Sequence, residues 1–132
     1  MPFDYLIDKK RRLIVSNVQG AVTVAEVRSK ISRMLDDPDF DPRLNELIDA
    51  TRVQKLYVPV AQILEFAGQP LLSKTSRTAW VVSNSVMWRT LAELLAAYMS
   101  VHTEAAVFHD VPSALEWIAA SGGSDQDSGS EL

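Results

Sequence analysis

The stretch LNELIDATRV, residues 44–53, combines a buried strand with a polar end. Its leucine, isoleucine and alanine side chains suit a strand inside a sheet over residues 44–50. A carboxylate, a hydroxyl and a guanidinium stand at its expected end, on Asp49, Thr51 and Arg52. Because open α/β sheets bind ligands at the carboxyl ends of their strands, these three side chains are candidates for binding a partner or a ligand.

Two strands and a helix are expected before this stretch. Apolar residues alternate over 3–7 and recur over 13–18, with a charged turn between them, which predicts an antiparallel hairpin. Thr23 and Glu26 have the spacing of a capping box, which starts a helix that ends before the DPDFDP loop. The apolar positions of this helix are Val24, Val27, Ile31, Met34 and Leu35, and the residues expected to face water are Arg28, Lys30 and Arg33.

Helices and strands alternate after the same stretch. Pro59 is well placed to open a second helix. The apolar run AWVVS, residues 79–83, suits a central strand that is covered on both faces. The remaining expected elements are a third helix from about Val86 to Met99, a fifth strand over 105–108 and a last helix over 111–120.

This order of elements predicts the fold class. It indicates one α/β domain over residues 1–120, with a mixed, mostly parallel five-stranded sheet in the order ββαβαβαβα and helices packed on its faces. Residues 121–132 read SGGSDQDSGSEL and are expected to form a flexible polar tail, because they cannot bury enough apolar surface to become ordered.

Composition excludes several classes of function. The 132 residues carry a net charge of −4, which disfavours nucleic acid as a partner. There are no cysteines, so disulfides, thiolate metal sites and cysteine nucleophiles are absent. The N-terminal MPFDYLIDKKRR is not a signal peptide, and no apolar run approaches the ~20 residues that cross a bilayer. A cytoplasmic protein without a membrane span is expected.

Three segments resemble one known superfamily. RRLIVSNVQGAVTVAEV (residues 11–27), DPDFDP (37–42) and VFHDVPSALEWI (107–118) are similar to SpoIIAA-like proteins, which include the STAS domains and are structurally related to CRAL-TRIO lipid-transfer domains. The resemblance covers about residues 3–120 and is greatest to small, stand-alone bacterial members. It implies a SpoIIAA-like fold and a non-enzymatic regulatory or protein-interaction module.

The resemblance makes Thr51 a candidate phosphorylation site. In anti-sigma-factor antagonists of this superfamily, an Asp-Ser-Ser-Gly motif ends the third strand and carries the phosphorylated serine. Asp49 matches the aspartate, but Ala50, Thr51 and Arg52 replace the other three residues. The alternative is that Asp49 and Thr51 only form hydrogen bonds with local backbone, and we expect no switch here.

A second polar stretch, Ser83, Asn84 and Ser85, follows the expected fourth strand. The next helix begins there, so its free N–H groups are candidates for holding an anion. The alternative is an ordinary helix cap made by one of the serines. We expect this loop and the Asp49–Arg52 loop to open on the same edge of the sheet and together to form the candidate site.

The third helix is apolar nearly all round. Met87, Leu91, Leu94, Leu95 and Tyr98 form its expected core stripe. An offset stripe is then a candidate dimer interface, with packing inside the same chain as the alternative. That stripe consists of Trp88, Ala92, Ala96 and Met99.

Two functions remain open after other chemistry is set aside. The aspartates of the DPDFDP loop lack the glycine and glutamate of a calcium loop, and His102 and His109 lack metal-ligand spacing. No catalytic nucleophile motif, metal or cofactor is therefore expected. The first function is a module that binds a protein partner or a second copy of itself. The second is a small domain that holds an apolar or anionic, lipid-like ligand between the second and third helices, near the carboxyl ends of the strands.

Overall fold

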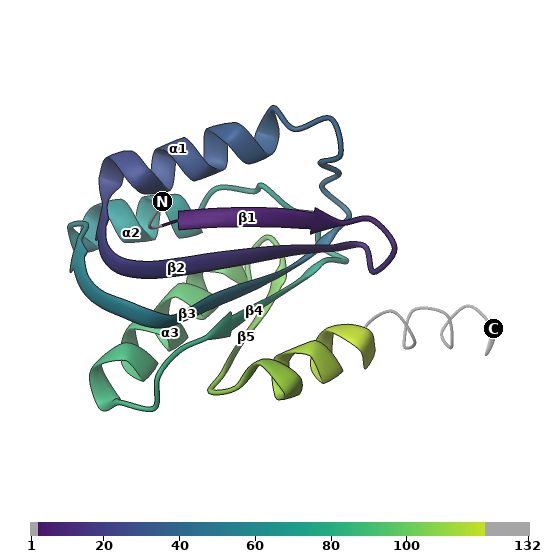
Figure 1. Ribbon diagram of the computed structural model, residues 1–132. Coiled ribbons are helices and arrows are strands. Elements are labelled where there is room, and N and C mark those ends of the chain that lie inside the picture. Colours follow the sequence, from purple (N-terminus) through teal and green to yellow (C-terminus); the bar gives the residue numbers. More distant parts are fainter. Residues whose placement is uncertain (1–2, 121–132) are drawn as a thin grey trace.

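A five-stranded sheet forms the centre of the computed structural model, which describes residues 3–120 (Figure 1). The strands lie side by side in the order in which they occur along the chain. The first pair is antiparallel and all later pairs are parallel, as the sequence predicts. The predicted tail, 121–132, lies outside the described residues. The strands are β1 Phe3–Asp8, β2 Leu13–Thr23, β3 Asn45–Tyr57, β4 Arg77–Val81 and β5 Glu104–Phe108.

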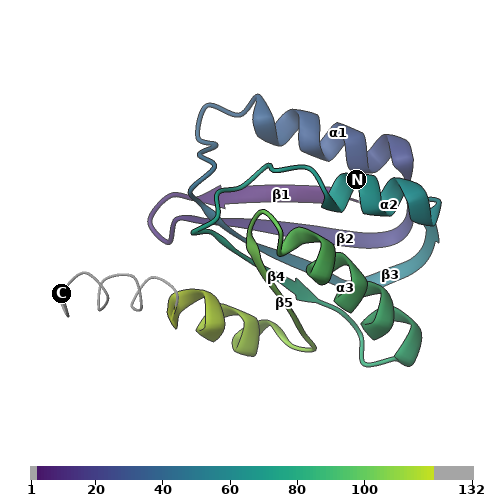
Figure 2. The ribbon, with the colours of Figure 1, turned by 180° about the vertical axis from the view of Figure 1, so that it is seen from behind.

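Helices cover both faces of the sheet (Figures 1 and 2). Three of them, α1 (Val24–Leu35), α2 (Val60–Ala67) and α3 (Val86–Met99), lie on one side, which we call the three-helix face. A last helix, described over residues 111–120, packs on the opposite face. Within the described chain, no helix has both the length and the apolar character needed to cross a membrane.

The start of α1 confirms the predicted capping box. The Thr23 hydroxyl accepts a hydrogen bond from the backbone N–H of Glu26 at 3.4 Å. The Glu26 carboxylate in turn accepts the backbone N–H of Thr23 at 2.8 Å. Two N–H groups that a helix start leaves without partners are thereby satisfied.

Strand register decides which side chains face which helices. Glu46 and Ile48 of β3 lie opposite Thr78 and Trp80 of β4, and all four side chains point to the three-helix face. The alternate residues point to the other face, where Leu47, Ala79 and Val81 pack against Ala114 and Ile118 of the last helix.

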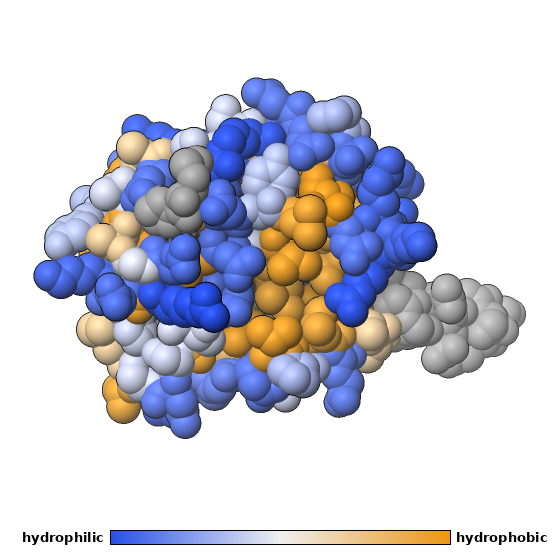
Figure 3. Space-filling view, viewed as in Figure 1, coloured by the Kyte–Doolittle hydropathy of each residue, from blue (hydrophilic) through white to orange (hydrophobic). Residues whose placement is uncertain are grey.

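The last helix leaves part of its own sheet face open. Leu6 on β1 is exposed, although its register partner Val15 on β2 packs at the edge of the core beneath this helix. Figure 3 shows the resulting apolar patch, which extends from the β1 end of the sheet to the last helix.

The third strand is longer than the sequence suggests. We expected β3 to end at Ala50, but it continues beside β2 until Tyr57 lies opposite Thr23. Its pairing with β4 stops much earlier, where Asp49 lies opposite Val81. The strand continues because β2 runs beside it as far as Tyr57 and, with register shifts beside Gln19 and Gly20, still offers it a hydrogen-bonding partner. The far half of β3 therefore separates from β4.

Helix α3 is oriented differently from the expectation. Its ends at Val86 and Met99 agree with the prediction, but Met87, Leu94 and Tyr98 of the predicted core stripe are exposed. A helix that is apolar nearly all round gives no periodic signal for its buried side. Two small residues decide the orientation, because they let the helix approach its neighbours closely. These are Ala92 and Ala96, which are 2% and 8% exposed.

Candidate functional site

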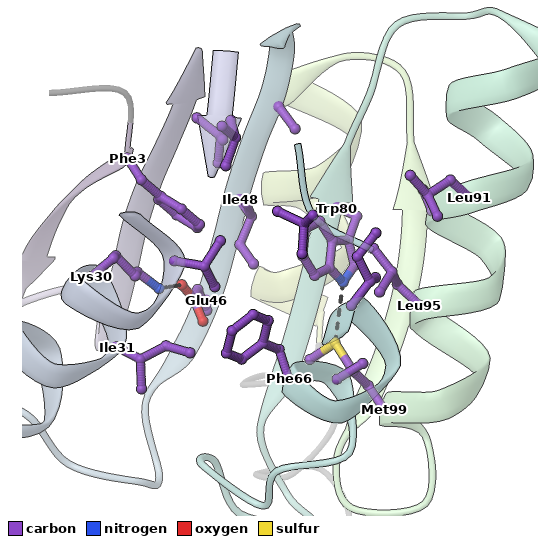
Figure 4. Close-up of a pocket in the computed structure, with 18 of the residues that line it drawn as sticks. Phe3, Lys30, Ile31, Glu46, Ile48, Phe66, Trp80, Leu91, Leu95 and Met99 are labelled. Carbon is purple, nitrogen blue, oxygen red and sulfur yellow. Dashed lines mark hydrogen bonds and ion pairs between the residues drawn. The ribbon is translucent and has the colours of Figure 1, made fainter. Parts of the chain in front are cut away.

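An apolar cavity of about 180 Å³ lies between the sheet and all three helices of the three-helix face (Figure 4). Its floor includes Ile48 and Trp80, which are neighbours on β3 and β4. Phe66 of α2 closes one side and Leu95 of α3 another (Figure 4). The cavity is partly open to solvent, so a small molecule can enter it without unfolding of the chain.

Two features of the sequence leave this space unfilled. First, β3 separates from β4 beyond Asp49, so no neighbouring strand lies beside Ala50 and Val53 on that side. Second, small side chains stand at the wall on three elements. These are Ala50 of β3, Ala67 of α2 and Ala92 of α3.

A buried ion pair forms the polar part of the cavity wall. Lys30 of α1 places Nζ 2.6 Å from Oε2 of Glu46 on β3, and the two residues are 3% and 5% exposed. The same oxygen accepts a hydrogen bond from the Ser16 hydroxyl at 2.6 Å. The Lys30 ammonium also lies 5.1 Å from the centre of the Phe3 ring, within the range of a cation–π interaction.

Lys30 corrects the expectation that it faces water. It lies on the buried side of α1 because it shares a helical stripe with Val27, Ile31 and Met34. The spacing of Lys30 within this stripe is a signal in the sequence for burial, whereas its charge favours the surface. Glu46 lies within the expected 44–50 strand, and its sequence context does not indicate a buried partner.

Aromatic and sulfur side chains line the end of the cavity near α3. The Trp80 indole N–H donates to Sδ of Met99 at 3.2 Å, and half-buried Trp88 lines the same wall. The next residues to line the cavity are His102 and Thr103. The Thr103 hydroxyl lies within hydrogen-bond distance of the backbone carbonyls of Ser73 and Ser76. No periodic pattern around His102 predicts this position.

The four residues predicted as a dimer interface do not form a surface stripe on the folded chain. Ala92 and Ala96 are buried inside the single chain, and Trp88 and Met99 line the cavity. The alternative of packing within the chain is the one that the structure shows, because this side of α3 faces the sheet.

The Ser83–Ser85 loop forms a helix cap. The Ser85 hydroxyl accepts a hydrogen bond from the backbone N–H of Trp88 at 3.3 Å, and the Ser85 N–H donates to the Ser83 carbonyl at 2.9 Å. Ser83, Asn84 and Ser85 do not contribute to the cavity lining. The helix start is thus capped by its own serine, as the simpler sequence interpretation held.

The DPDFDP loop holds carboxylates with lowered pKa values. The guanidinium of Arg43, followed by its backbone N–H, donates to Asp41 and lowers the pKa of that carboxyl to about 2. The backbone N–H of Asp39 and the hydroxyl of Tyr5 lower the pKa of Asp37. Burial and the bond to Asp37 raise the pKa of Tyr5 above its usual 10.0. These contacts fold the loop onto β1, away from the cavity.

Comparison with known proteins identifies the architecture. No protein-family model matches the chain, and no curated protein matches it. A similar solved structure is an uncharacterised protein of the DUF3478 family from Shewanella loihica PV-4, which has a SpoIIAA-like fold. The two share 15% identity over 88% of this chain and 91% of the other, with a TM-score of 0.61. This chain has a SpoIIAA-like fold. The sequence resemblance is confirmed at the level of the fold.

Within this SpoIIAA-like chain, Asp49 and Thr51 have local partners. Oδ1 of Asp49 accepts hydrogen bonds from the Thr51 N–H at 3.1 Å and from its hydroxyl at 2.7 Å. Thr51 lies inside β3, well before α2 begins at Val60, so it does not start a helix as the superfamily motif would require. Arg52 is exposed and shares a shallow surface depression with Thr51 and Gly20.

The two predicted loops begin where the pairing of β3 with β4 ends, and their role as a ligand site stays a prediction. Asp49 lies opposite Val81, whose side chain belongs to the core under the last helix, on the other face from the cavity. None of the six predicted residues lines the cavity. Over residues 3–120, no three acidic or histidine side chains come together as a metal site.

Proposed function

We propose that this chain is a non-enzymatic binding module that holds a small apolar molecule in the cavity between the sheet and the three helices. The cavity itself is the observation that carries the proposal: about 180 Å³, almost entirely apolar, and built from four parts of the fold. A ligand that fills the space removes this apolar wall from water, which contributes ~25 cal/mol per Å² of apolar surface buried.

Cavity size indicates the size of the ligand. An engineered protein cavity of ~150 Å³ lined by Leu, Ile and Phe binds benzene, so the present cavity suits a molecule of about ten non-hydrogen atoms or fewer. The lining supports binding more than catalysis, because its buried charges, Lys30 and Glu46, neutralise each other.

Toluene provides a direct test of the proposal. Trp80 and Trp88 line the cavity, so a bound ring should change their fluorescence. Trp117 packs against Phe108 on the other face and adds background, which a Trp117→Phe variant removes. We expect saturable binding in that variant, with the dissociation constant checked by calorimetry.

A matched pair of variants on α2 locates the bound ring. Ala67→Leu puts a larger side chain into the cavity and should abolish toluene binding while the fold is kept. Ala61→Leu makes the same change at an exposed position of the same helix and should leave binding intact. Equal binding by both variants, with circular dichroism unchanged, would contradict the proposed site.

The outer surface of α3 favours a second candidate function, namely self-association. Val86 and Met87 are 71% and 64% exposed, and Leu94 and Tyr98 are exposed on the same helix. We propose Met87→Lys and Leu94→Lys as tests. A lysine at either position would disrupt an apolar interface between two copies, but it would be tolerated on a surface that faces water. If light scattering shows a dimer in the wild type and monomers in the variants, this surface is the interface; a wild-type monomer at millimolar concentration contradicts it.

A further inference from the structure

One oxygen of Glu46 is used within the protein and the other is not. Oε2 accepts hydrogen bonds from both Lys30 and Ser16. Oε1 has no hydrogen-bond partner among the described residues. In the described chain, the polar side-chain atoms that are fully enclosed and lack a partner are Nε of Arg33 and Oγ1 of Thr78. Oε1 of Glu46 is not one of them, so part of its surface is accessible. Figure 4 shows the carboxylate ending between Lys30 and Phe66, at the cavity wall.

The Lys30 ammonium also has unused donor capacity. An ammonium carries three N–H donors, and only the bond to Glu46 is formed within the described chain. The remaining side of the group faces the ring of Phe3 and the cavity, both of which lack a strong acceptor. One acceptor and two donors thus remain unused at the same point in the wall of an apolar cavity.

The charges of the pair determine which polar group is acceptable there. A ligand carboxylate would be attracted by Lys30 but would lie within a few ångströms of the Glu46 carboxylate, and like charges repel strongly where water is excluded. A ligand ammonium would meet the same difficulty with Lys30. A neutral hydroxyl avoids both penalties, since it can donate to Oε1 and accept from Nζ.

We infer that the natural ligand is a neutral amphiphile, with a hydroxyl-type group on the Lys30–Glu46 pair and its hydrocarbon part against Trp80, Phe66 and Leu95. The inference rests on the proposed cavity function and specifies its ligand class. It keeps the apolar and drops the anionic alternative of the sequence expectation, which was an apolar or anionic, lipid-like ligand, because the buried lysine is already neutralised.

Four probes of similar size distinguish the ligand classes: toluene, 1-hexanol, hexanoate and hexylammonium. They are titrated at pH 7.5 against the Trp117→Phe protein by fluorescence and calorimetry. We expect 1-hexanol to bind about tenfold or more tightly than hexanoate and hexylammonium, since each charged probe meets a like charge of the pair where water is excluded. Equal or tighter binding of hexanoate or hexylammonium overturns the inference.

Variants of the pair give a second, independent readout. Glu46→Gln leaves the Lys30 charge without its counterion, so binding of hexanoate should strengthen and overtake that of 1-hexanol. The double variant Lys30→Met with Glu46→Leu replaces the pair by apolar side chains and remains testable if the single variant fails to fold. In this double variant the affinity of 1-hexanol relative to that of toluene should fall, because the hydroxyl has lost both of its partners. The control is Glu65→Gln, an exposed glutamate on α2.

The outcomes separate the inference from the proposal beneath it. If toluene and 1-hexanol both fail to bind, the proposed cavity function itself is wrong. If toluene binds but 1-hexanol shows no advantage over hexanoate, or the double variant keeps the original affinity of 1-hexanol relative to toluene, the cavity function stands and the assignment of a neutral polar group is wrong.

Discussion

Lys30 on α1 and Glu46 on β3 hold each other at 2.6 Å with both side chains almost fully buried. The pair joins a helix to the middle strand of the sheet and stands at the wall of an apolar cavity. Buried ion pairs contribute little net stability, because desolvation offsets the attraction between the charges. Fixing α1 on the sheet accounts for the pair better than net stability does, and we propose that the pair also presents polar groups to a ligand.

Removing one charge of this pair should destabilise the protein strongly. Lys30→Met leaves the Glu46 carboxylate buried without a counterion, and we expect the free energy of unfolding to fall by about 3–5 kcal/mol in urea denaturation. The double variant Lys30→Met with Glu46→Leu should recover most of the loss. Lys9→Met, at an exposed pair with Asp39, should change stability by less than about 1 kcal/mol. A double variant as unstable as the single one would contradict this account.

Two buried threonines should respond oppositely to the same substitution. The hydroxyl of Thr78, the cross-strand neighbour of Glu46, is enclosed without a hydrogen-bond partner in the described chain. Thr78→Val removes that unsatisfied group and should raise the free energy of unfolding by about 1 kcal/mol. The Thr103 hydroxyl lies 2.9 Å from the carbonyls of both Ser73 and Ser76, so Thr103→Val should lower stability by about 1–2 kcal/mol. Destabilisation by Thr78→Val would show that its hydroxyl has a partner.

The Asp41–Arg43 contact predicts a pH dependence at the acidic end. The folded pKa of Asp41 is lowered to about 2, below its usual value of 3.8. Its contribution is therefore complete above pH ~4 and is lost as the pH falls toward 2. Arg43→Met removes the guanidinium but keeps the backbone N–H, so the Asp41 pKa should rise partway toward its usual value. Carboxyl NMR titration measures this directly, and an unchanged midpoint would contradict the assigned cause.

Thr51 should not act as a phosphorylation switch. A phosphate or carboxylate at this position would stand beside Asp49, which already accepts two hydrogen bonds from Thr51. Thr51→Glu should therefore lower thermal stability through like-charge repulsion, without changing toluene binding, because neither residue lines the cavity. Phosphopeptide mapping of protein from cells that yields modified Thr51 would contradict this prediction.

Local signals in the sequence predicted the framework well. The capping box at Thr23 and Glu26, the limits of α3 and the antiparallel β1–β2 pair all depend on residues close together in the chain. These are the features that the structure confirms, together with the mostly parallel sheet.

Features that depend on distant partners were missed. The end of β3 is set by the length of β2, and the buried side of α3 is set by how closely Ala92 and Ala96 approach their neighbours. Lys30 was placed in water because its counterion, Glu46, lies on another element. The cavity depends on the end of β3, the orientation of α3 and the burial of Lys30. It lies where the pairing of β3 with β4 ends, beneath α1 and α3.

Binding of 1-hexanol, followed by NMR, tests the central claim most directly. The residues to observe are those that meet in the cavity: the Trp80 indole N–H, the Phe66 ring and the Leu95 methyl groups. We predict saturable shifts of these signals and nuclear Overhauser contacts from them to the alkyl chain, with signals of Thr51, Arg52 and Ser83 unmoved. An absence of shifts at Phe66, Trp80 and Leu95, or shifts confined to Thr51, Arg52 and Ser83, would contradict the account.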